Sequence, residues 1–183
     1  MNMLASRGQL RASFIRWALF TVPLCVLLGF LAGQSGGADT AWFRSLEKPA
    51  IYPPANTFPI VWSIMYVLIG LALAIVCSAW GARWRKVALI AFVIHFALNL
   101  SYTTVFFGRQ EIAAALVVLL LIDVTLLAVI TLFWKVRRTA GLLLLPYLVW
   151  VLFATVLNWQ FLQINPGADG ETGSSAQDRV RIG

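Results

Sequence analysis

The chain has 183 residues, of which 61% are hydrophobic and 11% are charged, and its formal net charge is +7. A soluble domain has about a quarter of its residues charged, so an ordinary soluble domain is excluded. The length leaves room for one membrane bundle, and the basic residues are too dispersed to indicate nucleic acid as a partner.

The chain begins with a basic segment, residues 1–16, which we expect to be separate and frayed. Residues 17–33 are apolar, and a helix needs about 20 such residues to cross a hydrocarbon core of about 30 Å. Basic residues before an apolar run are also typical of a secretory signal. This run is longer than the usual signal core and no good cleavage site follows, which favours a retained helix.

Residues 34–59 form the longest connector. It starts with Gln34-Ser35-Gly36-Gly37 and is then rich in aromatics and prolines: Trp42, Phe43, Pro49, Tyr52, Pro53, Pro54 and Phe58. Proline stiffens the backbone, and aromatic rings prefer the membrane interface. We therefore expect this segment to fold back over the bundle as a structured lid.

Four more apolar stretches follow, at residues 60–80, 87–107, 112–134 and 140–164, with short connectors between them. The pattern predicts an all-α integral membrane protein, a bundle of five transmembrane helices over residues 17–165. Residues 166–183 are rich in Gly, Ser, Asp and Arg, and we expect a disordered tail.

The basic residues orient this topology. They concentrate before the first stretch and in the second and fourth connectors: Arg7, Arg11, Arg16, Arg83, Arg85, Lys86, Lys135, Arg137 and Arg138. Positive charge favours the cytoplasmic side. We expect a cytoplasmic N-terminus, with the first loop and the C-terminus outside.

Polar and aromatic residues recur at helical spacing in three stretches. In each stretch these residues share one face of the expected helix. The faces are Trp62 and Tyr66 in residues 60–80; His95, Asn99, Tyr102 and Phe106 in residues 87–107; and Tyr147, Trp150, Ala154 and Asn158 in residues 140–164. Burying such groups against lipid is unfavourable, so the faces should look inward. Together they predict an aromatic cavity with few hydrogen-bonding groups, which suits a flat, mostly apolar ligand.

Other interpretations of these residues stay open. The stripes could be helix packing, with Asn99 and Asn158 as interhelical hydrogen bonds. His95 could be an axial metalloporphyrin ligand, a proton relay or, as we favour, an interhelical hydrogen-bonding group. Asp123 is the one acid in the middle of a stretch. Cys25 and Cys77 lie inside apolar stretches, so we expect packing residues and no disulfide or metal site.

Three ordered motifs resemble a known family. The run WFRSLEKPAIYPPANTFPIVWSIMY resembles the signature W-Y-x-x-L-x-K-P-x-W-x-P-P-x-x-x-F-x-x-x-W-x-x-x-Y of the TspO/MBR family, the tryptophan-rich sensory proteins related to the mitochondrial translocator protein. The segments LNLSYTTVFFG and PYLVWVLFATVLN resemble two later motifs of that family.

The resemblance implies a five-helix bundle, usually a homodimer, that binds porphyrins such as protoporphyrin IX and haem as ligands and needs no obligatory cofactor. Trp62 and Trp150 match pocket tryptophans implicated in light-dependent porphyrin breakdown. Other matches fall on the pocket (Asn99, Tyr102 and Ala154) and on the lid (Phe43, Pro53 and Pro54). Small residues are candidates for close approach at the dimer face: Gly70, Ala72, Ala74 and the run 113–115.

The sequence also departs from the family pattern. Ile51 replaces the usual Trp before the two prolines, and Phe43 and Tyr102 replace a Tyr and a Trp. No Arg or Lys follows the aromatics near residue 159, which argues against sterol binding. His95 stands where an amide or other polar residue is more usual.

The leading expectation is a receptor or sensor in a bacterial cell membrane that senses, sequesters or moves tetrapyrroles, with the bilayer and a second copy as partners. The alternatives are a porphyrin-degrading photoenzyme that uses Trp62 and Trp150, and a transporter of small molecules or sterols. The sequence shows no acid–base pair that would support the photoenzyme and no inverted repeat that would support the transporter.

Overall fold

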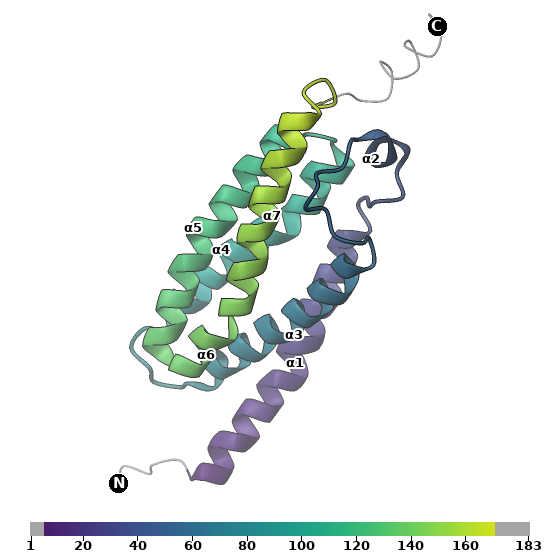
Figure 1. Cartoon of the computed structure of the whole chain (residues 1–183). Helices are drawn as coiled ribbons and strands as arrows, with labels where there is room; N and C mark the ends of the chain where they lie inside the picture. Colours follow the sequence, from purple (N-terminus) through teal and green to yellow (C-terminus); the bar gives the residue numbers. More distant parts are fainter. Residues whose placement is uncertain (1–5, 171–183) are drawn as a thin grey trace, which may run out of the picture.

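The computed structural model describes residues 6–170, and no strand occurs in this range. The helices are α1 (Arg7–Gly33), α2 (Ala41–Ser45), α3 (Thr57–Ser78), α4 (Arg85–Thr103), the π-helix η1 (Thr104–Gly108), α5 (Ile112–Val136), α6 (Arg138–Leu143) and α7 (Leu145–Ile164). Among the described residues, five helical units are long and apolar enough to cross a membrane, which confirms the predicted bundle. Figure 1 shows α2 at one end, beside the end of α7, and α6 with the start of α1 at the other.

The first helix begins at Arg7, well before the predicted boundary at residue 17. Ser6 caps it: the backbone N–H of Gln9 donates to Ser6 Oγ (3.2 Å), and the Ser6 N–H donates to Gln9 Oε1 (2.8 Å). This reciprocal capping box satisfies two donors that a frayed end would leave to water. Residues 7–16 are therefore the first turns of α1 and not a separate segment.

Glycines let α1 and α3 approach closely. A Cβ atom on Gly29 would lie 2.1 Å from the Tyr66 ring, and one on Gly70 would lie 2.6 Å from Val22 Cα. Thr21 Oγ1 also donates to the carbonyl of Gly70 (2.7 Å). Gly70 therefore serves packing within the chain, and Ala72 and Ala74 are fully buried. These residues do not form the exposed dimer face that the sequence suggested.

The fifth span contains a break that its composition did not predict. It divides into α6 and α7 at Leu144, two residues before Pro146. Proline has no N–H to donate to the carbonyl four residues earlier, and its ring restricts the residue before it. The backbone N–H of Leu144 instead donates to Gly141 (3.1 Å), which closes a tight turn before α7 starts.

The third span ends in a π-helix. The N–H of Arg109 donates to the carbonyl of Thr104 (2.9 Å), five residues earlier. Phe106 and Phe107 of η1 are in contact at 4.8 Å between ring centroids. The widened turn places both rings against Phe43 of α2, at 6.2 Å and 5.2 Å. Such single π turns are frequent at functional sites.

The segment after α7 packs on the bundle. Its residues 166–170 were predicted to be disordered, but the carbonyl of Ala168 accepts from Trp42 Nε1 (3.2 Å). Asp169 Oδ1 accepts from the N–H of Ala113 in the first turn of α5 (3.1 Å). These bonds tie residues 166–170 to α2 and α5. The rest of the predicted tail, 171–183, lies outside the described residues.

Candidate functional site

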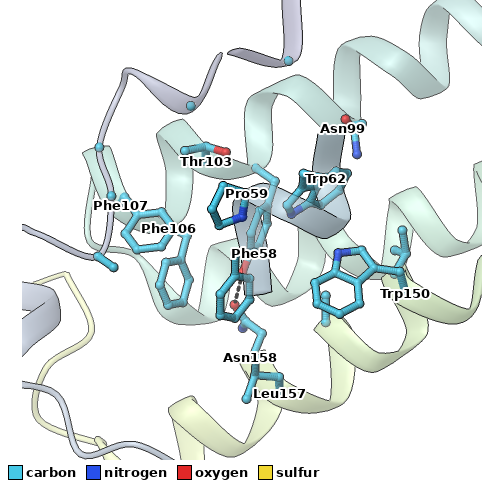
Figure 2. Close-up of a pocket in the computed structure, with 18 of the residues that line it drawn as sticks. Phe58, Pro59, Trp62, Asn99, Thr103, Phe106, Phe107, Trp150, Leu157 and Asn158 are labelled. Atoms are coloured by element: carbon cyan, nitrogen blue, oxygen red, sulfur yellow. Dashed lines mark hydrogen bonds between the residues drawn. The ribbon is translucent and has the colours of Figure 1, made fainter. Parts of the chain in front are cut away.

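A cavity of about 520 Å³ lies beneath the loop between α1 and α3, called the first loop here. Its walls come from α1, α3, α4, η1, α5 and α7. Figure 2 shows Trp62 of α3 and Trp150 of α7 in the same part of the lining, with Asn99 of α4 and Asn158 of α7 at the margins of the view.

Ten of the fourteen predicted ligand-binding residues line the cavity. They are Phe43, Phe58, Trp62, Tyr66, Asn99, Tyr102, Phe106, Trp150, Ala154 and Asn158. Four do not line it: Pro53, Pro54, His95 and Tyr147. In the first loop, their neighbours Tyr52 and Ala55 line the cavity instead of the two prolines.

The walls are built from aromatic pairs. Trp62 stacks on Tyr66 one helical turn away, with centroids 5.3 Å apart and planes 28° apart. Trp150 of α7 meets Phe58, at the start of α3, edge to face at 5.9 Å. Such pairs hold large flat surfaces in fixed orientations and add to the packing free energy beyond simple burial. The α3 and α7 sides of the cavity are therefore lined by packed aromatic rings.

A chain of hydrogen bonds crosses the bundle behind the cavity. Tyr66 Oη donates to Asn99 Oδ1 (3.2 Å), and Asn99 Nδ2 donates to Tyr147 Oη (2.8 Å). The two ring nitrogens of His95 lie 3.1 Å from Tyr147 Oη and 2.9 Å from Thr125 Oγ1. The Thr125 hydroxyl donates its proton to a backbone carbonyl one turn earlier (2.7 Å), so toward His95 it accepts.

This direction fixes the tautomer of the histidine. His95 carries its proton on Nδ1, donates it to Thr125 and accepts from Tyr147 at Nε2. Both ring nitrogens are thus engaged, and the residue is only 2% exposed. The structure places His95 as a link between α4, α5 and α7, with no nitrogen directed to the cavity as an axial ligand would require.

Asn158 belongs to a second polar group. Its Oδ1 accepts from Tyr102 Oη (3.2 Å), and its Nδ2 donates to the carbonyl of Ile112 (3.0 Å). Trp150 differs: its Nε1 is buried and has no hydrogen-bonding partner among the described residues. A buried donor without a partner is unfavourable. A ligand that presents an acceptor beside Trp150 would remove that cost.

The first loop contributes Phe43 to the cavity lining, and this ring is only 4% exposed and packs against Phe161 of α7 at 5.7 Å. Lys48 Nζ lies 4.4 Å from the centroid of the Phe43 ring and donates to the carbonyl of Leu46 (2.7 Å). Desolvation lowers the pKa of Lys48 and raises the pKa of Tyr52, which also lines the cavity.

One wall of the cavity was not predicted from the sequence. It comes from α1 and the start of the first loop: Val26, Gly29, Phe30, Gly33, Gln34, Gly36, Gly37 and Ala38. Gly36 has a φ of 154°, and a Cβ there would lie 2.7 Å from Cβ of Phe107. Only glycine fits this close approach. The Gly36-Gly37 pair was the available signal, because adjacent glycines permit a close approach of the backbone.

Asp123 lies outside the cavity lining. Its Oδ2 accepts from Thr155 Oγ1 of α7 (2.8 Å), while its Oδ1 is buried without a partner among the described residues. Within residues 6–170, no group of three or more His, Cys, Asp or Glu side chains could hold a metal ion. Cys25 and Cys77 are free and buried. The cavity itself therefore offers aromatic faces and a few amide, hydroxyl and indole groups.

Comparison with known proteins gives this cavity a family context. The model of the TspO/MBR family matches residues 21–164. The chain is 37% identical to the tryptophan-rich protein TspO of Chlorobaculum tepidum, over 79% of this chain and 93% of that protein. It is 35% identical to the protein CrtK of Rhodobacter capsulatus, over 74% and 87% of the two chains. It is 32% identical to the human translocator protein, over 73% and 80%. The five membrane-length helices, the three motifs and these matches together show that the chain is a multi-pass membrane protein of the TspO/MBR family.

Proposed function

We propose that the chain is a membrane receptor or sensor that binds a tetrapyrrole, such as protoporphyrin IX or haem, in the cavity beneath the first loop. The observation that carries the proposal is the position of Trp62 and Trp150, which line the same cavity from α3 and α7. The names of two relatives, the tryptophan-rich sensory protein of Cereibacter sphaeroides and the human translocator protein, are consistent with a sensing or transport role.

The chemistry of the lining suits a large, flat, mostly apolar ligand. Aromatic rings form most of the walls, and a planar macrocycle can stack between them. Ligand sites of this kind are typically apolar with a few fixed polar groups. Here Asn99 and the unpartnered Trp150 Nε1 are such groups, and the propionates of a porphyrin would supply the acceptors.

The first loop would act as the lid of this site. Phe43 and Tyr52 line the cavity from the loop side, and the loop is hydrogen-bonded to the end of α7. Release of a bound macrocycle through this end would require the loop to move. The ligand should therefore exchange more slowly from this cavity than it would from an open groove.

A titration tests the proposal. Protoporphyrin IX added to the purified full chain should quench tryptophan fluorescence saturably, and Trp62→Phe with Trp150→Phe should remove most of the saturable part. Trp159→Phe is the matched control, because Trp159 also lies on α7 but is 50% exposed on the outside. Quenching that does not saturate, or that is equal in the double variant and the control, would contradict the proposal.

Porphyrin breakdown by light is a second candidate, favoured by the same pair of tryptophans at the cavity. It predicts a defined product that forms in illuminated protein and not in the Trp62→Phe, Trp150→Phe double variant. Bleaching at the rate of free protoporphyrin IX would leave binding as the function and reject the enzyme.

A further inference from the structure

A second feature of the molecule lies at the end of the bundle opposite the first loop. The start of α1, the α3–α4 connector and the α5–α6 connector all lie toward this end, where α1 projects beyond the other helices (Figure 1). These segments and the helix ends beside them carry a concentration of basic residues: Arg11, Arg16, Arg83, Arg85, Lys86, Lys135, Arg137 and Arg138. The acidic residues stand at positions 39, 47, 111, 123, 169, 171 and 178, so none belongs to these segments. Among the described residues, this end has no carboxylate of its own to neutralise it.

An open groove of about 360 Å³ lies at this end, between α1 and the residues just after α3. Ser13, Arg16, Trp17 and Phe20 line it from α1, and Trp80 lines it from the other side. Phe20 is 59% exposed and Trp80 is 69% exposed, so these large rings are not covered by the chain's own residues. The groove thus combines a cation, a hydroxyl and three exposed or partly exposed rings.

The outer wall of the groove is held in place. The guanidinium carbon of Arg85 lies 4.2 Å from the centroid of the Trp80 ring. Arg85 Nε and Nη2 also donate to the carbonyl of Cys77, at 3.2 Å and 3.0 Å. A cation at these carbonyls complements the end of α3. Arg85 therefore fixes Trp80 at the edge of the groove, while Arg16 supplies a cation on the α1 side.

We propose that this groove binds the headgroup of an anionic phospholipid. Arg16 and Ser13 would hold the phosphate, because guanidinium groups bind phosphate oxygens through charge-assisted hydrogen bonds. Trp17, Phe20 and Trp80 would pack along the glycerol and the first acyl carbons, where indole rings are preferred. The excess of unneutralised positive charge favours an anionic over a zwitterionic lipid. This site is separate from the cavity and does not rest on the proposed function.

Native mass spectrometry of the full chain tests this proposal, with phosphatidylglycerol and phosphatidylcholine of identical acyl chains as the probes. We expect the anionic lipid to bind more tightly and its affinity to fall as salt rises. Arg16→Gln should lower that affinity about fivefold, the usual effect of one basic residue at an anionic surface. Arg109→Gln is the matched control, since it removes one exposed cation at the opposite end. Trp80→Leu should weaken the binding of the lipid without changing the oligomeric state.

Four results would overturn the proposal. The first is equal retention of both lipids by the unmodified chain, which needs no variant and therefore holds even if a variant fails to fold. The second is an equal effect of Arg16→Gln and Arg109→Gln. The third is full displacement of the lipid by millimolar inorganic phosphate, which would indicate a simple anion site. The fourth is a change of oligomeric state in Trp80→Leu with lipid binding intact, which would assign the groove to a second copy of the chain.

Discussion

The side-chain amide of Asn165, just after α7, forms two hydrogen bonds with the backbone of Glu47 in the first loop. The N–H of Glu47 donates to Asn165 Oδ1 (2.8 Å), and Asn165 Nδ2 donates to the carbonyl of Glu47 (3.1 Å). Residues that are far apart in the sequence thus join the first loop to the end of α7. The first loop is thus held in two ways: the chain continues directly into α3, and the two Glu47–Asn165 hydrogen bonds attach the loop to the end of α7.

Asn165→Ala should loosen the first loop. Both hydrogen bonds disappear, and a typical bond contributes about 0.5–1.5 kcal/mol net. We expect the amide of Glu47 to exchange with deuterium at least fivefold faster and protoporphyrin IX to dissociate several-fold faster. Hydrogen exchange and stopped-flow dissociation measure these two effects. Gln163→Ala is the control because Gln163 is an exposed amide nearby. Equal rates in the two variants would show that the pair does not hold the loop.

His95→Gln and His95→Leu distinguish a hydrogen-bonding role of the histidine between helices from a direct contact of its imidazole with the ligand. A Gln side chain can donate to Thr125 and accept from Tyr147, so it can preserve both hydrogen bonds of His95. Leucine preserves neither and leaves the fully buried Tyr147 hydroxyl without its acceptor. We expect His95→Leu to lower the free energy of unfolding by about 1–2 kcal/mol and His95→Gln to lower it by less. Loss of ligand binding in His95→Gln, with stability retained, would instead indicate that the imidazole itself contacts the ligand.

Gly29→Ala should disturb the cavity from behind. The new Cβ would lie 2.1 Å from the ring of Tyr66, which lines the cavity and donates to Asn99. Overpacking of this kind usually costs about 1–3 kcal/mol, so we expect lower thermal stability and weaker binding of protoporphyrin IX. Gly33→Ala is the matched control on the same helix, because nothing lies within 4 Å of its Cβ. Similar melting temperatures for the two variants would contradict the close approach of α1 and α3.

Trp150→Phe removes the unpartnered indole N–H while keeping an aromatic ring in the wall. A hydrogen bond to a charged acceptor is stronger than a neutral one. We expect the affinity for protoporphyrin IX to fall about tenfold, whereas a porphyrin without carboxylates should lose much less. Fluorescence titrations with the two porphyrins measure the difference. Equal losses for both would assign Trp150 a stacking role only.

The fold could be predicted largely from composition. In a membrane the backbone N–H and C=O groups must form hydrogen bonds within the protein, so a long apolar stretch forms a helix. Structural details that depend on single hydrogen bonds were harder to predict from the sequence. The start of α1 was encoded in Ser6 and Gln9, and the break before α7 in Pro146, but hydropathy alone does not detect either. The order of residues 166–170 depends on partners in α2 and α5, which no local pattern reveals.

The residues that line the cavity could be predicted in part from the sequence. Helical spacing indicates which residues share a face, so most of the stripe residues line the cavity. Spacing does not indicate how far along the helix a cavity extends. His95 and Tyr147 are the first residues of their stripes and lie nearest the basic end, where Tyr147 is fully buried and His95 is bonded to Thr125. The wall from α1 had no polar or aromatic pattern to mark it.

The structure of the chain with bound protoporphyrin IX would test the central claim most directly, the claim that the tryptophans of α3 and α7 face one shared ligand site. We expect density for the macrocycle between Trp62 and Trp150, beneath Phe43, with an acceptor of the ligand within hydrogen-bonding distance of Trp150 Nε1. A macrocycle bound only on the outer, lipid-facing surface, with the cavity unchanged, would contradict it.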